Sequence, residues 1–416
     1  MKKSNQILTV LFAVFLVLPI LSVFATQQDS WTTMEPIPTA NGWLGATMVN
    51  GKIYAIGGSG GYGSTTVNEY DPITNIWTTK TSMPTPRIFF GIAVVENKIY
   101  TIGGDRGNYE IGITPTAINE VYDPATDTWE TKTSMPTRRF GVSASVVNNK
   151  IYIIGGKTSN PYPDISITEA YDPITDKWTT MEPLPTPVSH HTSAVVNNKI
   201  YILGGAINVN LNQIYDTEID SWTDGNPLPT GVDQAAAAVI NVDNTTQRIF
   251  VVGGKQDIDA VNLNQVYIVE EDRWFSGPSM PTARHGLGVA VVNDSIYAIG
   301  GREGSPFFGF SISLANERYT PIVNNSDYTN SEFILMLLLT VILTSIIIVI
   351  IAVIYKRNQI NQNIQTTRYN QIGRLSKKTI IQKFSSLTIP VASLSIALVL
   401  SIIYRNRFQG KKNEDK

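Results

Sequence analysis

The stretch Ile53-Tyr54-Ala55-Ile56-Gly57-Gly58 decides the fold, because the chain repeats its pattern six times. Each copy is a short apolar strand that ends in a pair of glycines, and the later pairs are Gly103-Gly104, Gly155-Gly156, Gly204-Gly205, Gly253-Gly254 and Gly300-Gly301. Successive first glycines are 46, 52, 49, 49 and 47 residues apart. Self-similarity at such a period is the signature of a repeat architecture.

A tryptophan recurs in the same register, at Trp31, Trp77, Trp129, Trp178, Trp222 and Trp274. The next first glycine follows after 26 residues in five cases and after 31 in the case of Trp222. The second unit predicts four strands, at residues 92–95, 99–102 and 120–122 and at Trp129, with a turn opened by Asp123-Pro124. A four-stranded unit cannot bury both of its faces alone, so we expect the units to stack radially and interpret the tryptophans and glycine pairs as structural.

The order glycine pair, Tyr-Asp and tryptophan, at about fifty residues per unit, resembles the kelch repeat, whose domains form β-propellers. The resemblance covers residues 30 to 321, roughly 70 % of the chain. It implies an all-β fold with six blades and does not specify a function.

The two ends of the repeat region predict how the ring closes. The last unit reaches a third strand at Glu317-Arg318-Tyr319, and no tryptophan follows it. A matching fourth strand, Ser30-Trp31-Thr32-Thr33, stands before the first unit. We therefore expect the N-terminal strand to complete the sixth blade.

Apolar segments flank the repeats and divide the chain into domains. Residues 1–25 have the basic start and apolar run of a cleavable secretory signal, with an uncleaved anchor as the alternative. The propeller then occupies 26–325 and a linker 326–332. Residues 333–355 contain no charge and are long enough for a transmembrane helix, and Lys356 and Arg357 follow at once.

The segments on the two sides of the predicted transmembrane helix differ in charge, and this difference predicts the orientation of the chain in the membrane. Residues 26–332 carry 18 Lys and Arg against 32 Asp and Glu, whereas residues 356–416 carry 12 against 2. Basic residues beside a membrane helix favour the cytoplasmic side, so we expect 356–386 to be cytoplasmic and the propeller to be extracytoplasmic at the cell membrane. Residues 387–404 predict a second transmembrane helix or an interfacial helix, and 405–416 form a basic tail whose side stays open.

Function is expected where the repeats diverge, which is in the blade connections and in the loops between the second and third strands. These segments are rich in arginine, histidine and aromatic residues, which suit an anionic peptide or a saccharide. The predicted ligand-binding residues are Trp43, Tyr62, Arg87, Tyr109, Arg139, His190, His191, Arg284, His285 and Phe308. Arg87, Arg139 and Arg284 share one repeat position, ten residues after the tryptophan, so a scaffold role is the alternative for them.

The amino-acid composition argues against several kinds of site and activity. The chain has no cysteine, which excludes disulfides and the tyrosine–cysteine copper cofactor of galactose oxidase, a kelch-type enzyme. The three histidines follow no metal-ligand spacing, so we expect no metal and no cofactor. The acidic repeat region also argues against nucleic acid. We expect a non-catalytic surface module that binds a protein or glycan. The alternative is a sugar epimerase that uses loop carboxylates such as Glu110, Asp164, Asp257 or Glu303.

Overall fold

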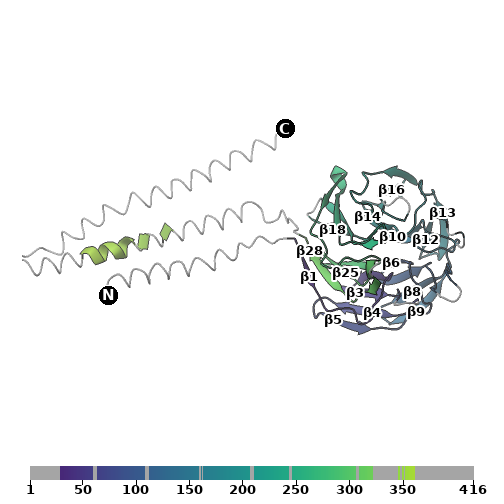
Figure 1. Ribbon diagram of the computed structural model, residues 1–416, viewed down its shortest axis with the longest axis horizontal. Helices are drawn as coiled ribbons and strands as arrows, with labels where there is room; N and C mark the ends of the chain where they lie inside the picture. Colours follow the sequence, from purple (N-terminus) through teal and green to yellow (C-terminus); the bar gives the residue numbers. More distant parts are fainter. Residues whose placement is uncertain are drawn as a thin grey trace, which may run out of the picture. The chain divides into compact units, whose positions relative to one another are not determined.

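The computed structural model describes residues 29–59, 63–107, 112–158, 161, 163–206, 210–242, 246–305, 309–321, 345–346, 349–350 and 352–360. The chain divides into two compact units, Met1–Asp327 and Tyr328–Lys416. In the first unit, six four-stranded antiparallel sheets surround a central axis (Figure 1). The predicted six-bladed all-β propeller is therefore confirmed.

The first three blades follow the chain without interruption. Blade 1 comprises β2 (Gly45–Val49), β3 (Lys52–Ile56), β4 (Val67–Asp71) and β5 (Ile76–Thr79). Blade 2 comprises β6 (Gly91–Val95), β7 (Lys98–Ile102), β8 (Asn119–Asp123) and β9 (Thr128–Lys132). Blade 3 comprises β10 (Ser143–Val147), β11 (Lys150–Ile154), β12 (Thr168–Asp172) and β13 (Lys177–Met181).

The last three blades include two additional hairpins. Blade 4 comprises β14 (Thr192–Val196), β15 (Lys199–Leu203), β16 (Asn212–Asp216) and β17 (Ser221–Asp224). Blade 5 comprises β18 (Ala236–Asn241), β19 (Gln247–Val252), β22 (Asn264–Ile268) and β23 (Arg273–Ser276), with the hairpin β20 (Lys255–Gln256) and β21 (Asp259–Ala260) and the 3₁₀ turn η1 (Val269–Glu271). Blade 6 comprises β24 (Gly288–Val292), β25 (Ser295–Ile299), β28 (Asn316–Thr320) and β1 (Ser30–Thr33), with the hairpin β26 (Arg302–Ser305) and β27 (Gly309–Ile312).

The N-terminal strand closes the ring, as the sequence predicts. Strand β1 pairs antiparallel with β28, so that Ser30 lies opposite Thr320 and Thr33 opposite Glu317. The indole of Trp31 packs against Tyr319, with 5.1 Å between the ring centroids, and donates a hydrogen bond to the carbonyl of Pro278. The first and last segments of the propeller therefore belong to one blade.

Burial explains the composition of each strand. The second strand of a blade is covered on both faces. After their first lysine, β3, β11 and β15 accordingly read as continuous apolar runs, and β7 does so except for Thr101. The innermost strands alternate between fully and partly buried residues, and the fourth strands are largely exposed and polar. Hydrophobic stabilisation is thus concentrated between blades.

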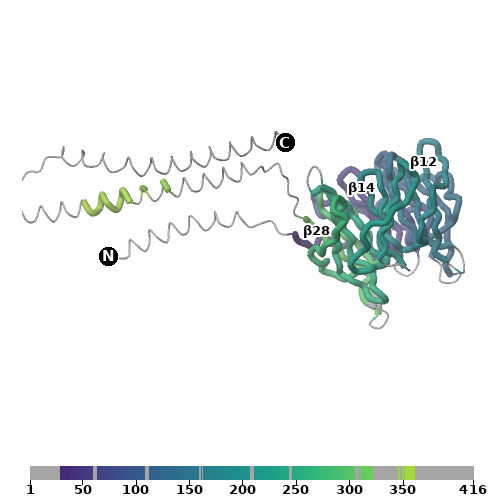
Figure 2. The backbone as a smooth tube through the Cα atoms, turned by 90° about the horizontal axis from the view of Figure 1, so that it is seen from above, coloured from purple at the N-terminus to yellow at the C-terminus, as the bar shows by residue number. Residues whose placement is uncertain are grey.

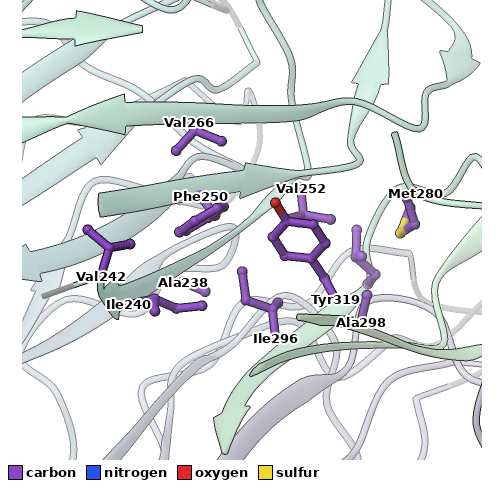
Figure 3. Packing of buried hydrophobic residues seen from close by; sticks show 11 residues of the cluster. Ala238, Ile240, Val242, Phe250, Val252, Val266, Met280, Ile296, Ala298 and Tyr319 are labelled. Atoms are coloured by element: carbon purple, nitrogen blue, oxygen red, sulfur yellow. The ribbon is translucent and has the colours of Figure 1, made fainter. Parts of the chain in front are cut away.

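Each interface between blades is a separate apolar cluster. Between blades 5 and 6, Phe250 and Val266 face Ile296 and Tyr319 of the next blade (Figure 3). The repeat tryptophans link blades through a second contact, because each indole N–H donates to a carbonyl in the connection before its blade. The pairs are Trp31–Pro278, Trp77–Glu35, Trp129–Thr81, Trp178–Thr133, Trp222–Glu182 and Trp274–Asn226, at 2.8–3.0 Å. This confirms their structural role.

The propeller has two distinct faces. We call the side with the blade connections and the second-to-third loops the connection face, and the side with the first-to-second and third-to-fourth turns the turn face. The sheets stand side by side in a second view (Figure 2). Strand β28 begins beside the glycine pair, where Gly300 donates to the carbonyl of Ala315, so it runs from the connection face to the turn face. Because Ser30 pairs with Thr320, both ends of the propeller leave from the turn face.

The second unit is described only in part, and residues 352–360 are helical. Within the described portion of the chain, no helix has the length and apolar character needed to cross a membrane. The predicted signal segment 1–25 and the segment 387–404 lie outside the described residues, as does most of 333–355.

Candidate functional site

The six blade connections place one residue each in the left-handed backbone conformation, two residues before the innermost strand. These residues are Trp43, Phe89, Gly141, His190, Gln234 and Gly286, with φ between 52° and 64°. Four of the six are not glycine, and such residues rarely adopt a positive φ. The same conformation in every blade, whatever the residue type, shows that the fold itself imposes it.

Backbone hydrogen bonds join these six residues into a closed circle around the axis, which we call the axial ring. The N–H of each residue donates to the carbonyl of its counterpart in the preceding connection. The donor–acceptor pairs are Trp43–Gly286 (2.6 Å), Phe89–Trp43 (3.4 Å), Gly141–Phe89 (2.9 Å), His190–Gly141 (2.8 Å), Gln234–His190 (2.9 Å) and Gly286–Gln234 (2.8 Å). Because main-chain groups make the ring, it fixes the backbone without specifying side chains.

The side chains of the axial ring pack against one another. Phe89 lies 4.9 Å from Trp43 and 4.7 Å from His190 between ring centroids, and the indole N–H of Trp43 donates to Oε1 of Gln234 (2.8 Å). The two glycines make room for this packing, since a Cβ on Gly286 would lie 2.4 Å from Cδ1 of Trp43 and one on Gly141 would lie 3.2 Å from the His190 ring. The aromatic members are half-buried.

A second circle of residues lies directly beside the axial ring and follows the glycine pairs. We call it the outer ring, and it consists of Ser59, Asp105, Lys157, Ala206, Lys255 and Arg302. Each member is tied to a blade connection through its backbone, as in the bridges Phe140–Lys157, Asp233–Lys255 and His285–Arg302. Three of the six positions are therefore cationic.

These cations have defined neighbours. Nζ of Lys157 lies 2.8 Å from Asp164, and Nζ of Lys255 lies 3.4 Å from Asp233. The guanidinium of Arg302 lies over the indole of Trp43, 4.4 Å from its centroid, which is a cation–π contact. Arg302 and Trp43 thus connect the outer ring to the axial ring.

The pKa values of two histidines, His190 and His285, are lowered, and cations of the outer ring are among the causes. Burial, together with smaller effects of Lys157 and Lys255 that Asp164 opposes, lowers the pKa of His190 to about 4. Burial likewise lowers the pKa of His285 to about 4, with Lys255 and Arg302 acting in the same direction. Both imidazoles are neutral near pH 7.

The three repeat arginines do not belong to this surface, and their assignment as ligand-binding residues is corrected. Arg87, Arg139 and Arg284 have no exposed surface. Each forms an ion pair with a glutamate on the third strand of the blade that follows its connection; the partners are Glu120 (2.5 Å), Glu169 (2.7 Å) and Glu317 (2.7 Å) respectively. The Arg87 guanidinium also donates to the carbonyls of Thr101, Gly103 and Ile118. The scaffold alternative is the one that this burial supports.

The three histidines that were predicted to bind a ligand lie in different environments. His190 is in the axial ring, whereas the adjacent His191 is buried, bonds to the hydroxyl of Ser143 (2.8 Å) and has its pKa lowered by burial to about 3. His285 is also buried, and its Nδ1 lies 2.9 Å from Oε1 of Gln234. The described residues contain no group of three or more potential side-chain metal ligands.

Other predicted residues fall elsewhere. Trp43 is in the axial ring, whereas Tyr62, Tyr109 and Phe308 lie outside the described residues. Lys157 and Lys255 are not among the residues predicted from the sequence. The position immediately after the glycine pair would have identified them, because it is equivalent in every repeat.

Comparisons with known proteins agree with this architecture. A Kelch motif matches residues 44–84, 86–136 and 138–185, and a second Kelch motif matches 187–229, which correspond to blades 1 to 4. A solved structure described as "Structure of YjhT" superposes with a TM-score of 0.57 at 17 % identity, over 68 % of this chain and 96 % of that one. At this identity the likeness concerns the fold alone. Kelch repeats are therefore shown within residues 44–229, and they form the first four blades of a six-bladed β-propeller.

Proposed function

We propose that this protein is a non-catalytic interaction module that binds a protein partner on the connection face, around the axis. The observation that carries the proposal is the axial ring. Six equivalent backbone positions hold one conformation through a closed circle of hydrogen bonds, yet they display Trp, Phe, Gly, His, Gln and Gly. A rigid backbone with unlike side chains is how repeat scaffolds build recognition surfaces.

The contacts of the aromatic residues favour a protein over a neutral glycan. A sugar ring requires an open aromatic face on which to stack. Trp43 already contacts Phe89, Gln234 and Arg302, and Phe89 contacts Trp43 and His190. Stacking of a sugar on these rings would require the ring packing to open.

The same proposal includes a membrane tether. The apolar run 333–355 and its basic flank support an anchor, and the charge balance supports an extracytoplasmic propeller. Both ends of the propeller leave from the turn face. Within the propeller, these ends are therefore on the face opposite to the connection face.

Site-specific photocrosslinking tests the proposed face. The chain has no cysteine, so Gln256→Cys on the connection face and Ala125→Cys on the turn face each give one labelling site. Both residues are exposed. With a cysteine-linked photocrosslinker on full-length protein in its native membrane, we expect partner adducts from Gln256→Cys and not from Ala125→Cys. Adducts from Ala125→Cys alone would place the binding surface on the turn face and reject the proposal.

A further inference from the structure

The most exposed apolar side chains of the propeller lie on the turn face. Among the described residues of the blades, the large apolar side chains with the highest exposed fractions are Ile73 (89 %), Ile174 (79 %) and Ile219 (71 %). Each is in the turn between the third and fourth strands, in blades 1, 3 and 4 respectively. Single exposed apolar residues are common on protein surfaces, but these three recur at one turn of the repeat.

Hydrogen bonds to an aspartate fix the backbone of each of these three turns. The carboxylate of the aspartate that opens the turn accepts a backbone N–H at the isoleucine or at the residue before it. The donor–acceptor pairs are Ile73–Asp71 (2.9 Å), Ile174–Asp172 (2.9 Å) and Glu218–Asp216 (3.0 Å). The three isoleucines are therefore carried on ordered turns and are not covered by the chain.

The charges of the turn face differ between blades. Nζ of Lys52 lies 2.5 Å from Asp71, and Nζ of Lys199 lies 3.2 Å from Asp216, so the aspartates of these two turns have a cation beside them. An apolar surface approaches such tips without leaving an unpaired carboxylate. The corresponding part of blade 5 carries the exposed Glu270 and Glu271 instead. The apolar tips are thus a property of particular blades and not of the repeat.

The three tips are spread around the propeller axis. In a ring of six blades, blade 1 is opposite blade 4, and blade 3 is next to blade 4 (Figure 1). Three such points define one plane across the turn face. A partner that contacts all three is therefore flat and as wide as the propeller, which fits a bilayer surface and excludes a small ligand.

The chain that leaves the propeller limits the distance to its apolar segment. Strand β28 ends at Thr320 on the turn face, and residues 322–332 separate the propeller from the apolar run 333–355. Eleven residues span at most about 40 Å when fully extended. With 333–355 in a bilayer, as the proposed function holds, the end of β28 stays within that distance of the lipid. Even weak contacts are then populated, because the tether raises the effective concentration.

We infer that the turn face rests on a lipid bilayer, with Ile73, Ile174 and Ile219 inserted at the level of the headgroups. This inference rests on the proposed membrane tether and adds a second, reversible contact to it. Each side chain that leaves water gains hydrophobic free energy, and the three act together because one scaffold carries them. Contact through apolar side chains requires no anionic lipid, so it forms on a zwitterionic bilayer and is insensitive to salt.

Fluorescence quenching by brominated lipid tests the inference on full-length protein reconstituted into phosphatidylcholine vesicles. The chain has no cysteine, so Ile73→Cys, Ile174→Cys and Ile219→Cys each place one environment-sensitive dye at a turn tip. Ile258→Cys is the matched control, because Ile258 is an exposed isoleucine between β20 and β21 on the connection face. We expect brominated phosphatidylcholine to quench the three tip dyes by roughly half or more and to leave the Ile258→Cys dye unchanged.

A triple variant tests the isoleucines themselves. The dye is then placed on Ala125→Cys, an exposed position in the equivalent turn of blade 2, between blades 1 and 3. In the I73S/I174S/I219S background, quenching of this dye should fall by at least about twofold, because the inserted side chains are lost. The substituted residues are exposed, so the variant should unfold at the temperature of the wild type.

The matched control variant is I113S/I258S/L314S, which removes three exposed apolar side chains from the connection face. It should leave quenching of the Ala125→Cys dye unchanged. Equal quenching of the Ile174→Cys and Ile258→Cys dyes, or an equal loss in the two triple variants, overturns the inference. Tip dyes that are shielded from aqueous iodide but not quenched by lipid also overturn it, because a second copy of the chain then covers the tips.

The inference and the proposed tether fail separately. Retention of the protein by the vesicles after an alkaline carbonate wash measures the tether. Unquenched tip dyes in a retained protein overturn the inference and leave the tether. Quenched tip dyes in a protein that the wash removes support the lipid contact and reject the tether, and a protein that shows neither property rejects both.

Discussion

Arg87 and Glu120 form an ion pair of 2.5 Å in the interior of the propeller, and the pair recurs as Arg139–Glu169 and Arg284–Glu317. Each arginine enters from a blade connection and each glutamate lies on the third strand of the following blade. The ion pair thus fixes the connection to the following blade, two residues before the residue of the axial ring. In these three repeats, the buried arginine of the scaffold and the axial-ring residue of the candidate site therefore lie in the same connection.

Breaking one of these pairs should destabilise the fold strongly. Arg139→Met leaves Glu169 buried without its cation, which should lower the free energy of unfolding by about 3–5 kcal/mol. Arg138→Met is the matched control, because Arg138 is the exposed neighbour and its loss should change stability by less than about 0.5 kcal/mol. Urea unfolding measures both. Equal midpoints for the two variants would contradict a buried scaffold role.

Removal of the closing strand should abolish cooperative unfolding. Deletion of residues 29–36 removes β1, exposes the edge of β28 and leaves Tyr319 without Trp31. The ring then has an open blade, and we expect a broad transition at a much lower temperature in differential scanning calorimetry. A deletion variant that melts like the full chain would show that closure contributes little.

The packing of the Trp43 indole against residue 286 should require a glycine at that position. Its φ is +59°, and a Cβ would lie 2.4 Å from Cδ1 of the indole. Gly286→Ala should cost about 2–4 kcal/mol through crowding and backbone strain. Gly51→Ala is the control, since Gly51 has a φ of +75° but nothing within 4 Å of a Cβ, and it should cost only about 1 kcal/mol. Thermal unfolding distinguishes the two, and equal costs would argue against the close packing.

Stability should rise with pH between about 5 and 6.5. In the unfolded chain a histidine titrates near pH 6.5, whereas the pKa values of His190 and His285 in the folded protein are about 4 and that of His191 about 3. The unfolded state therefore binds more protons in this window. The stabilisation is complete above pH 6.5 and declines as the pH falls toward the folded pKa values.

His190→Gln tests this linkage through the slope and not through absolute stability. Each histidine whose pKa is lowered on folding contributes up to about 1.4 kcal/mol per pH unit to the dependence of the unfolding free energy on pH. The variant should have a shallower slope by about that amount in urea titrations from pH 5 to 6.5. An unchanged slope would show that His190 titrates alike in both states.

Much of the propeller follows from repeat spacing. The nearly constant number of residues from each tryptophan to the next glycine pair predicts the blades, because both residue types make the same structural contacts in each repeat. The indole of each tryptophan bonds a carbonyl of the preceding connection, and in Gly155 a Cβ would lie 2.4 Å from the carbonyl of Val188. The strand at Ser30–Thr33 was predictable for the same reason, since it supplies the tryptophan that the last unit lacks.

The candidate site was less predictable. His190 and His191 are adjacent in the sequence, yet one belongs to the axial ring and the other is buried against Ser143. The left-handed conformation at His190 separates them, and residue type does not signal it where Trp, Phe, His and Gln occupy the position. Lys157 and Lys255 are isolated residues in the sequence, and they approach a common axis only when the ring closes.

The sequence by itself determined the blade number, the strand order and the closing strand, because these depend on local patterns repeated in register. Only the tertiary structure decided which polar residues are scaffold and which face the axis. Arg87 illustrates the difference, since an arginine in a connection can point outward or inward, and Glu120 on another strand decides the direction. That choice depends on a partner 33 residues away, which no local pattern specifies.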